Sequence, residues 1–149
     1  MSTDTLPKIA ILATGGTIAG VGDAGKSIGY QSGQLSVDDL LGSCPEIADI
    51  AQVEAKQICN VNSDDITAPI WLDLARTIEK MAFDDDVDGF VVLHGTDTMD
   101  ETAYFLGLVL KTDKPVVLTG SQIPLCEIRS DGRDNLITAL LIAGEGIEI

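Results

Sequence analysis

The sequence predicts an α/β fold in which a mainly parallel sheet carries helices on both faces. Short apolar runs alternate along the chain with segments of helical periodicity, as repeated βα units require. Some of these runs contain no polar residue, which is typical of strands buried on both faces of a parallel sheet. The chain has 149 residues and is 45% hydrophobic, which is enough for one sizeable core, so residues 1–149 are expected to form one domain.

The first half of the chain contains two predicted strands and a predicted helix. The apolar run Lys8–Ala13 predicts a buried strand, and the glycines of Thr14–Gly20 directly after it allow a sharp turn close to a ligand. Polar and apolar residues alternate over Val53–Ile58, which indicates a half-buried strand. Ala68–Phe83 is predicted to be an amphipathic helix, since apolar residues recur there at spacings of three and four, at Trp71, Leu74, Ile78 and Met81.

The second half of the chain repeats this alternation of strands and helices. Phe90–Leu93 is a continuous apolar run and predicts a buried strand. Thr98–Glu101 has the pattern of a capping box, and it predicts a helix that runs to about Leu110. Val116–Leu118 predicts another buried strand, and Leu136–Ala143 predicts a further helix.

Charge and composition exclude several classes of protein. The net charge of −15, from 24 acidic and 9 basic residues, argues against nucleic-acid binding, which needs a basic face. No apolar run approaches the roughly 20 residues of a membrane span, and residues 1–5 lack the basic start of a signal peptide, so a cytosolic location is expected. Three widely spaced cysteines are expected to be small buried residues rather than a disulfide framework or a zinc site: Cys44, Cys59 and Cys126.

Two ligand-binding patterns fail on their context. Gly20–Ser27 matches the spacing of a phosphate-binding P-loop, but the residues after it have no apolar helical period, whereas a P-loop must open a helix. Asp84–Asp88 is rich in carboxylates but lacks the glutamate and the spacing of a calcium loop, and a solvated turn is favoured. His94 is the only histidine and the sequence has no cluster of metal ligands, so no metal site is expected.

Polar side chains follow four predicted strands at the point where each strand ends. They are Thr17, Asn62–Asp65, Thr96–Asp97 and Thr119–Gln122. The carboxyl ends of parallel strands meet at one edge of a sheet, so these groups are expected to converge there. Two threonines delivered by two strand ends favour nucleophilic chemistry over phosphate binding.

Each candidate residue also has a purely structural interpretation. A hydrogen bond to the turn backbone explains the Thr17 hydroxyl equally well, and support of the following helix start explains Thr96–Asp97. Ser63 fits a helix cap, and Tyr30 fits a partly buried loop anchor. His94, at a strand end, is expected to be a hydrogen-bonded core residue rather than a catalyst.

Five motifs extend the pattern over nearly the whole chain. They are Ala13–Gly20 (ATGGTIAG), Asn62–Asp64 (NSD), His94–Ala103 (HGTDTMDETA), Lys114–Pro124 (KPVVLTGSQIP) and Arg129–Gly132 (RSDG). Through them the chain resembles the bacterial-type L-asparaginases, which are threonine-nucleophile amidohydrolases. The two threonine motifs, in this order and spacing, are highly specific to that family. The resemblance implies the family's N-terminal domain, of Rossmann or flavodoxin-like architecture.

The resemblance implies hydrolysis of L-asparagine to L-aspartate and ammonia through a threonine acyl-enzyme, with no cofactor. Thr17 takes the place of the nucleophile that attacks the side-chain amide carbon, and Tyr30 that of the flexible-loop tyrosine that assists it. Thr96 takes the place of the second active-site threonine, and Asp97 completes the catalytic set. A zwitterionic substrate needs donors for its carboxylate and an acid for its ammonium. The implied substrate-binding residues are Ser63, Asp64, Thr96, Asp97 and Ser121.

Other functions stay open at this stage. A glutaminase-asparaginase, or an amidotransferase subunit that releases ammonia, would use the same residues, so L-glutamine is an alternative substrate. A catalytically silent amino-acid-binding module is a different class, and a subunit that completes its site with a partner chain is a third. The silent module is favoured by one departure: the family's central lysine, which hydrogen-bonds the second aspartate–threonine pair, matches no lysine of this chain.

The resemblance also bears on assembly. Full-length family members continue into a C-terminal domain that contributes substrate contacts to a neighbouring subunit. Residues 144–149 of this chain are predicted to be a loop followed by the first residues of another strand. A sheet that lacks its next strand exposes an unpaired edge and apolar surface, so the chain is expected to form a homo-oligomer.

Overall fold

The sheet is wholly parallel in the residues that the structure describes. The structure is a computed structural model, and it describes residues 5–21, 36–83 and 86–145. The strands lie in the order β2-β1-β3-β4, and neighbouring strands are parallel. Their bounds are β1 Lys8–Gly15, β2 Gln52–Val61, β3 Gly89–Leu93 and β4 Val116–Thr119. The predicted parallel sheet is therefore confirmed.

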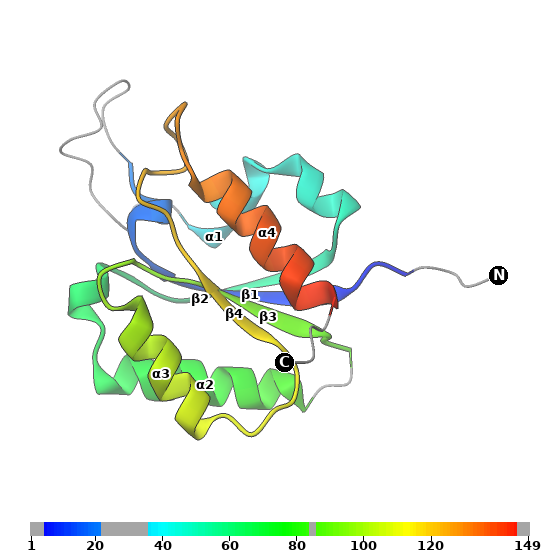
Figure 1. The fold of residues 1–149 in the computed structure, drawn as a ribbon, viewed down its shortest axis with the longest axis vertical. Coiled ribbons are helices and arrows are strands. Elements are labelled where there is room, and N and C mark those ends of the chain that lie inside the picture. The colour runs from blue at the N-terminus through cyan, green and yellow to red at the C-terminus, as the bar shows by residue number, and fades with distance from the viewer. Residues whose placement is uncertain (1–4, 22–35, 84–85, 146–149) are drawn as a thin grey trace.

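Helices cover both faces of the sheet, as predicted (Figure 1). α1 (Val37–Gly42) and α4 (Gly132–Glu145) lie on one face, and α2 (Ala68–Ala82) and α3 (Met99–Val109) lie on the other. Short 3-10 helices occupy three of the connections: η1 Thr17–Ala19, η2 Pro45–Asp49 and η3 Ser63–Asp65. Over the described ranges, no helix is both long enough and apolar enough to span a membrane.

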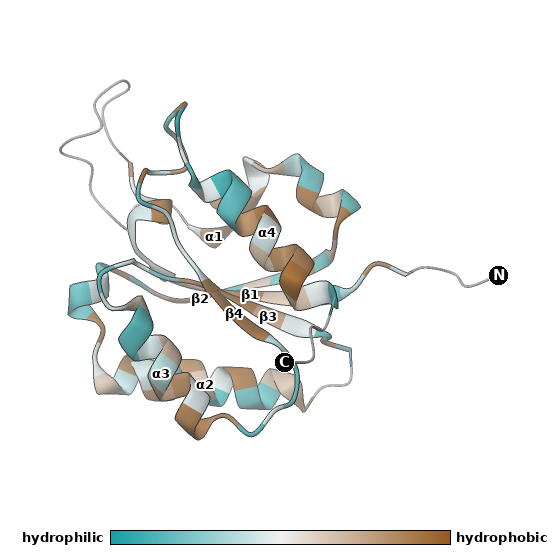
Figure 2. Cartoon of the chain, in the orientation of Figure 1, coloured by the Kyte–Doolittle hydropathy of each residue, from teal (hydrophilic) through white to brown (hydrophobic). Residues whose placement is uncertain are grey.

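Alternation along β1 divides the core into two layers. Ile9, Ile11 and Ala13 pack with residues of α1 and α4, whereas Ala10 and Leu12 pack with residues of α2 and α3. Every residue of β3 is also buried, as its apolar run predicts. Figure 2 shows hydrophobic residues concentrated along the strands, between the two helix layers. The two central strands are thus held from both faces, and this determines where their carboxyl ends lie.

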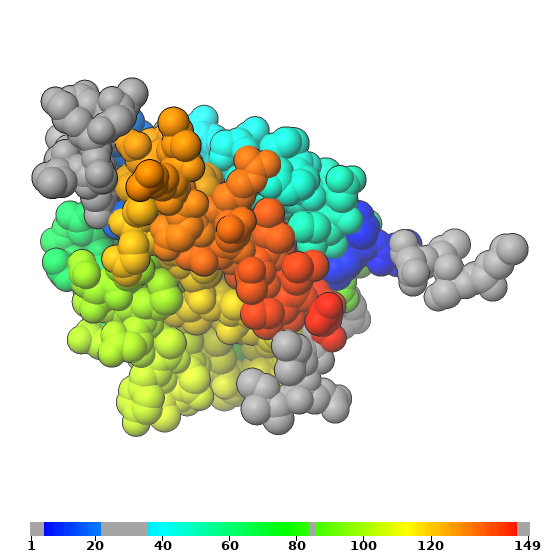
Figure 3. Space-filling view, turned by 45° about the horizontal axis from the view of Figure 1, so that its top comes forward, coloured from blue at the N-terminus to red at the C-terminus, as the bar shows by residue number. Residues whose placement is uncertain are grey.

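The fourth strand departs from the prediction, because β4 is half-buried rather than buried. Within the described residues β4 pairs with β3 alone, so it forms one edge of the sheet. Figure 3 shows the yellow segment that contains β4 reaching the surface between α3 and α4. β2, at the opposite edge, is half-buried as predicted, and it is longer than the alternation of Val53–Ile58 indicates.

The helix starts differ from the prediction in their capping. α3 begins at Met99 as expected, but its N-cap Thr98 makes no side-chain capping bond. The backbone of Thr98, at φ −127° and ψ 21°, is outside the extended region that a capping residue adopts. Its hydroxyl donates instead to the carbonyl of Ser63 at 2.9 Å. The predicted capping box is therefore wrong.

Helical periodicity does not reveal α1, which has only 6 residues. A helix this short contains too few turns to show an apolar period. Ser36 and Asp39 form a reciprocal capping box at its start, and this is the local signal that could have identified it.

The three cysteines have different environments. Cys44 is buried, Cys59 is half-buried and Cys126 is exposed, and all are free thiols. The expectation of three buried cysteines is therefore wrong for Cys126 and only partly right for Cys59. Cys126 is exposed because it lies in the surface connection between β4 and α4.

Candidate active site

The carboxyl ends of β1, β2 and β3 open onto one cavity. Its volume is about 180 Å³. The connections that follow these strands line it, with the residues Gly16, Thr17, Asn62, Ser63, Asp64, Gly95, Thr96 and Asp97. Three of the groups that were expected to converge at this edge therefore do so.

Two glycines let the chain turn at the end of β1. Gly15 and Gly16 have φ angles of 109° and 83°, a region that favours glycine. A Cβ on Gly15 would lie 2.5 Å from the carbonyl oxygen of Val61, and one on Gly16 would lie 2.5 Å from backbone atoms of Gly95. The backbones of three connections therefore meet here, and the turn delivers Thr17 to the cavity.

The connection after β2 carries Ser63 and Asp64 in η3. Ser63 is buried and Asp64 is exposed. The hydrogen bond from Thr98 Oγ1 to the Ser63 carbonyl fastens this connection to the start of α3. The N-cap positions of η3 and α2 are Asn62 and Thr67. The interpretation of Ser63 as a helix cap is therefore wrong.

The connection after β3 carries Thr96, which is half-buried, and Asp97, which is exposed. Both immediately precede α3, whose first residue is Met99. The positive end of a helix favours a nearby negative charge, such as a substrate carboxylate or a developing oxyanion. This end of the cavity therefore suits an anionic group.

His94 is fully buried at the end of β3, beside the cavity-lining residues. Its Nδ1 lies 2.7 Å from the Gly95 carbonyl oxygen, and because a carbonyl only accepts, Nδ1 carries the proton. Nε2 then accepts from Thr102 Oγ1 at 2.8 Å, and Thr102 accepts from Trp71 Nε1 at 2.8 Å. Burial lowers the pKa of His94, against the opposing effect of the hydrogen bond to Gly95. His94 is a hydrogen-bonded core residue, as predicted.

A family model covers almost the whole chain. The model of the asparaginase N-terminal domain matches residues 8–148. The chain belongs to the asparaginase family. It is 47% identical over 140 residues to the probable periplasmic L-asparaginase of Haemophilus influenzae, an alignment of 94% of this chain with 40% of that relative. It is 51% identical over 140 residues to L-asparaginase 2 of Bacillus subtilis, covering 93% of this chain and 37% of that relative.

A relative with a second activity in its name and a solved structure match this chain at a similar sequence identity. The glutaminase-asparaginase of Pseudomonas aeruginosa is 47% identical over 141 residues, covering 94% of this chain and 39% of that relative. The crystal structure of the probable cytoplasmic L-asparaginase from Campylobacter jejuni superposes with a TM-score of 0.88 at 46% identity, over 92% of this chain and 42% of that one. This asparaginase-family chain thus spans about 40% of the length of the curated relatives it matches.

In this asparaginase-family chain, Ser121 does not line the cavity. It follows β4 and is buried, and its Oγ donates to the carbonyl of Ile123 at 2.8 Å. Asp131 holds the same turn, because its carboxylate accepts from the N–H groups of Gln122 and Ile123 at 3.0–3.1 Å. Burial on its own raises the pKa of Asp131, but these hydrogen bonds outweigh it and the pKa is lowered. Ser121 and Asp131 therefore order the connection beyond β4.

Two of the sequence candidates lie wholly or mostly outside the described residues. They are Tyr30 and the Gly20–Ser27 pattern. Conversely, sequence reasoning assigns no separate role to Asn62 and Gly95, although both line the cavity. Each stands next to a predicted site residue in the sequence, which is the signal that could have identified it.

The cavity combines short hydroxyl and carboxylate side chains. Thr17, Ser63 and Thr96 supply hydroxyls, and Asp64 and Asp97 supply carboxylates. Hydroxyls can hold a substrate carboxylate, and carboxylates can hold an ammonium. Among the lining residues that the structure describes none is a histidine, cysteine or lysine, and the threonine and serine hydroxyls are candidate nucleophiles. The arrangement suits covalent chemistry on a small zwitterion.

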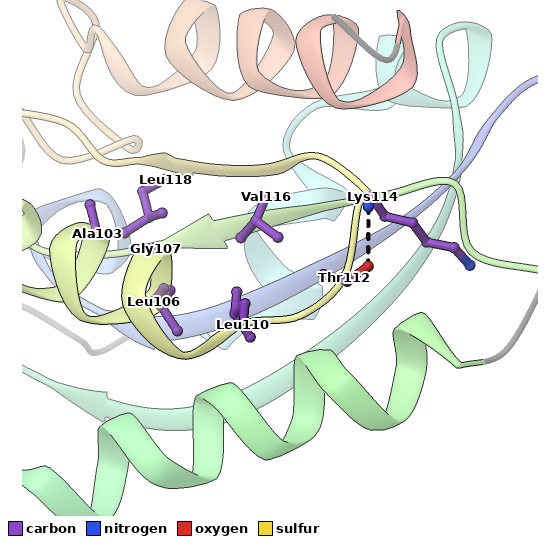
Figure 4. A pocket seen from close by; sticks show the side chains of 8 residues that line it. All are labelled: Ala103, Leu106, Gly107, Leu110, Thr112, Lys114, Val116 and Leu118. Atoms are coloured by element: carbon purple, nitrogen blue, oxygen red, sulfur yellow. Dashed lines mark hydrogen bonds between the residues drawn. The ribbon is translucent and has the colours of Figure 1, made fainter. Parts of the chain in front are cut away.

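A larger groove lies elsewhere, between α3 and β4. Its volume is about 300 Å³. Figure 4 shows its apolar side chains and the polar end near the start of β4: Leu106, Leu110, Val116, Leu118, Thr112 and Lys114. The N–H of Lys114 donates to Thr112 Oγ1 at 3.1 Å at that end. None of the predicted site residues lines this groove, although Thr96 lines the cavity of about 600 Å³ that continues it. The smaller cavity, where Thr96 lies with Thr17 and Ser63, remains the candidate active site.

Proposed function

We propose that the chain is an L-asparaginase-type amidohydrolase that converts L-asparagine to L-aspartate and ammonia. The observation that carries the proposal is that Thr17 and Thr96, from separate strand ends, line one cavity together with carboxylates. The names of the relatives, two of which are L-asparaginases at 47% and 51% identity, support the same substrate.

The proposed reaction runs through an ester of Thr17. Thr17 Oγ attacks the side-chain amide carbon, its proton passes to the amide nitrogen, and ammonia leaves. Water then attacks the ester carbon, a proton returns to Thr17 Oγ, and aspartate leaves. We assign assistance of Thr17 to Tyr30, and proton handling beside the substrate to Thr96 and Asp97. Dividing the hydrolysis in this way replaces one difficult step with two easier ones.

The α-groups of the substrate bind, in this proposal, at the other end of the cavity. Asp64 and Asp97 suit the α-ammonium, because both are carboxylates at the rim. The hydroxyls of Ser63 and Thr96, with the start of α3, suit the α-carboxylate. Ser121 contributes indirectly, since its hydroxyl holds the turn after β4.

Two other functions have specific support. L-Glutamine is the alternative substrate, because the Pseudomonas aeruginosa relative is a glutaminase-asparaginase. A silent amino-acid-binding module is the competing function, because the hydroxyls and carboxylates that line the cavity can bind a zwitterion without hydrolysing it.

Ammonia release and aspartate binding by the purified chain separate these functions. Hydrolysis of asparagine faster than glutamine supports the asparaginase, and equal hydrolysis supports the glutaminase-asparaginase. Aspartate binding without any hydrolysis contradicts the enzyme and supports the binding module. A chain that neither binds aspartate nor hydrolyses asparagine contradicts the enzyme and the binding module alike.

We propose further that residues 1–149 form one domain, equivalent to the N-terminal domain of the longer relatives, and that it is cytosolic. The single sheet with its two core layers supports one domain. The similarity to a structure described as a cytoplasmic L-asparaginase supports the location, and the periplasmic relative offers the alternative. Limited proteolysis tests the first point, and cell fractionation tests the second.

We also propose that the chain forms a homodimer in which a second copy covers the open edge of β4. The apolar groove of Figure 4 runs beside this edge. On α3, Ala103 and Gly107 line this groove and are exposed. Strand edges flanked by apolar surface tend to pair with another strand.

Charge favours a two-fold related copy as this partner. Lys114 lies at the amino end of the groove, and Asp100 lines its continuation at the carboxyl end. A two-fold axis sets β4 antiparallel to its copy, so each Lys114 end meets an Asp100 end. This local match opposes the general repulsion between two chains of net charge −15.

A further inference from the structure

Just before the turn at Gly15 and Gly16, the regular backbone pairing between β1 and β2 is interrupted, and side chains join the two strands instead. Ala13 pairs with Gln57, but the next pair is Gly15 with Val61. β2 therefore advances by four residues while β1 advances by two, and a bulge lies in β2 between these pairs. Pairing resumes at Gly16, whose N–H donates to the Val61 carbonyl at 3.0 Å.

The carboxamide of Gln57 fills this bulge. Its Nε2 donates to the Ala13 carbonyl at 3.2 Å and also to the Cys59 carbonyl. Its Oε1 accepts from the N–H of Val37 at 3.0 Å, at the start of α1. Because only the oxygen can accept from an N–H, this contact fixes the orientation of the carboxamide and directs both Nε2 hydrogens at the two carbonyls. One side chain thus joins β1, β2 and α1.

A contact made by Cys59 across the bulge is weaker. Cys59 Sγ lies 3.3 Å from the carbonyl oxygen of Thr14, and a thiol is a weak donor. The amide hydrogens of Gln57 are therefore stronger donors than this thiol. The two strands come close together again at the end of the bulge. A Cβ on Gly15 would lie 2.5 Å from the carbonyl oxygen of Val61, so there is no room for a side chain at this position.

We propose that Gln57 is a positioning residue that sets the register of Thr17 against Ser63 and Asp64. Without the bulge, regular pairing would place Cys59 rather than Val61 opposite Gly15. Ser63 would then be displaced along β2 by two residues, or about 7 Å at the usual rise of a parallel strand. Such a displacement separates the nucleophile from the groups assigned to the substrate's α-carboxylate and α-ammonium. The importance of this register rests on the proposed function.

Two glutamines on β2 provide a matched test. Gln57→Glu and Gln52→Glu both exchange an amide for a carboxylate and add one negative charge. Gln52 is exposed at the start of β2, opposite Lys8 and far along the strand from the bulge. Only Gln57→Glu removes the two donors from the Ala13 and Cys59 carbonyls.

Amide hydrogen exchange followed by NMR on the whole chain reads the register directly, because Gly16 N–H is the donor of the resumed pairing. We expect exchange at Gly16 to be at least about tenfold faster in Gln57→Glu than in Gln52→Glu. The amides of Ile11 and Val91, in the centre of the sheet, should stay equally protected in both variants. Gln57→Met, which removes the donors without adding charge, should reproduce the Gln57→Glu result.

Three outcomes overturn the proposal. Equal exchange at Gly16 in Gln57→Glu and Gln52→Glu shows that Gln57 does not hold the register. Uniform loss of protection through β1 and β3 assigns Gln57 to general stability, and so does loss of folding in both Gln57 variants. The measurement needs no turnover, so an inactive parent contradicts the proposed function and leaves the register inference standing.

Discussion

Thr17 follows the Gly15–Gly16 turn directly, so the backbone more than its own side chain determines where it lies. Thr17→Ala is expected to change the free energy of unfolding by at most about 1–2 kcal/mol. Asparagine turnover should fall by several orders of magnitude, as it does when a covalent nucleophile is lost. Thr17→Ser should keep part of the turnover, because it retains the oxygen.

Asparagine hydrolysis, aspartate binding and thermal unfolding of both variants check this expectation beside the parent chain. Aspartate binding should persist in Thr17→Ala, because Ser63, Asp64 and Asp97 remain. An active parent whose Thr17→Ala variant is equally fast rules out Thr17 as the nucleophile.

His94 is the residue through which pH acts on the core. Burial lowers its pKa from the ordinary 6.5, so the folded chain takes up this proton at lower pH than the unfolded chain does. Its contribution to stability is therefore complete above about pH 6.5 and is lost progressively as pH falls below that value.

Urea unfolding at several values between about pH 7 and pH 5.5 tests this, because few groups other than histidine titrate there. His94 is the only histidine in the chain, so a His94→Gln variant should lose most of the pH dependence in that interval. A parent chain whose stability is flat over the interval contradicts the assignment.

At the scale of elements, Thr98 joins two connections instead of capping α3. Thr98→Val keeps the shape but removes the hydroxyl, and it leaves the Ser63 carbonyl without this donor. We expect a loss of about 1 kcal/mol in the free energy of unfolding and weaker aspartate binding, with the helix content unchanged. Thr98→Ser is the control and should retain most of both, whereas reduced helix content in Thr98→Val would restore the capping interpretation.

The elements that sequence patterns predict well are those whose signal is local and repeated. The buried strand Phe90–Leu93 and the amphipathic helix over residues 68–82 are examples, since several neighbouring residues carry the apolar pattern of each. The partial burial of β4 is not predictable from its own apolar residues, because it depends on which strands lie beside it, and in the described part of the chain β3 is its one neighbour. The use of the Thr98 hydroxyl likewise depends on Ser63, 35 positions away.

The candidate site follows the same division. The meeting of Thr17, Ser63 and Thr96 is predictable, because the carboxyl ends of parallel strands share an edge. Ser121 also follows a strand, but β4 lies at the far side of β3 and the Ser121 hydroxyl bonds within its own turn. The bulge that Gln57 fills has no local sequence signal, since it appears only in the pairing of β2 with β1.

For the whole molecule, the main prediction concerns association through β4. The parent should sediment as a dimer at micromolar concentration. Ala103→Lys places a charge in the groove, because Ala103 is exposed and lines it, and this variant should shift the chain to monomer. Ile128→Lys is the control: Ile128 is fully exposed in the connection before α4, and its replacement should leave the dimer intact.

A monomeric parent would contradict the homodimer and leave the β4 edge for a further part of a longer chain, since the relatives are more than twice as long. If the parent is a dimer and both lysine variants are monomers, the contact lies elsewhere on the surface. Circular dichroism of each variant establishes that any change in mass does not come from unfolding.

The unequal exposure of the three thiols gives the chain a ready position for a reporter dye. Burial and the nearby Asp73 charge raise the pKa of Cys59, so little reactive thiolate forms there near neutral pH, and Cys44 is shielded from solvent. Cys126 is exposed, with its Sγ 3.6 Å from the carbonyl oxygen of Gly20, just beyond η1. A maleimide fluorophore would therefore attach chiefly at Cys126 of the native chain, where its emission can follow amino-acid binding at the neighbouring strand ends without any substitution.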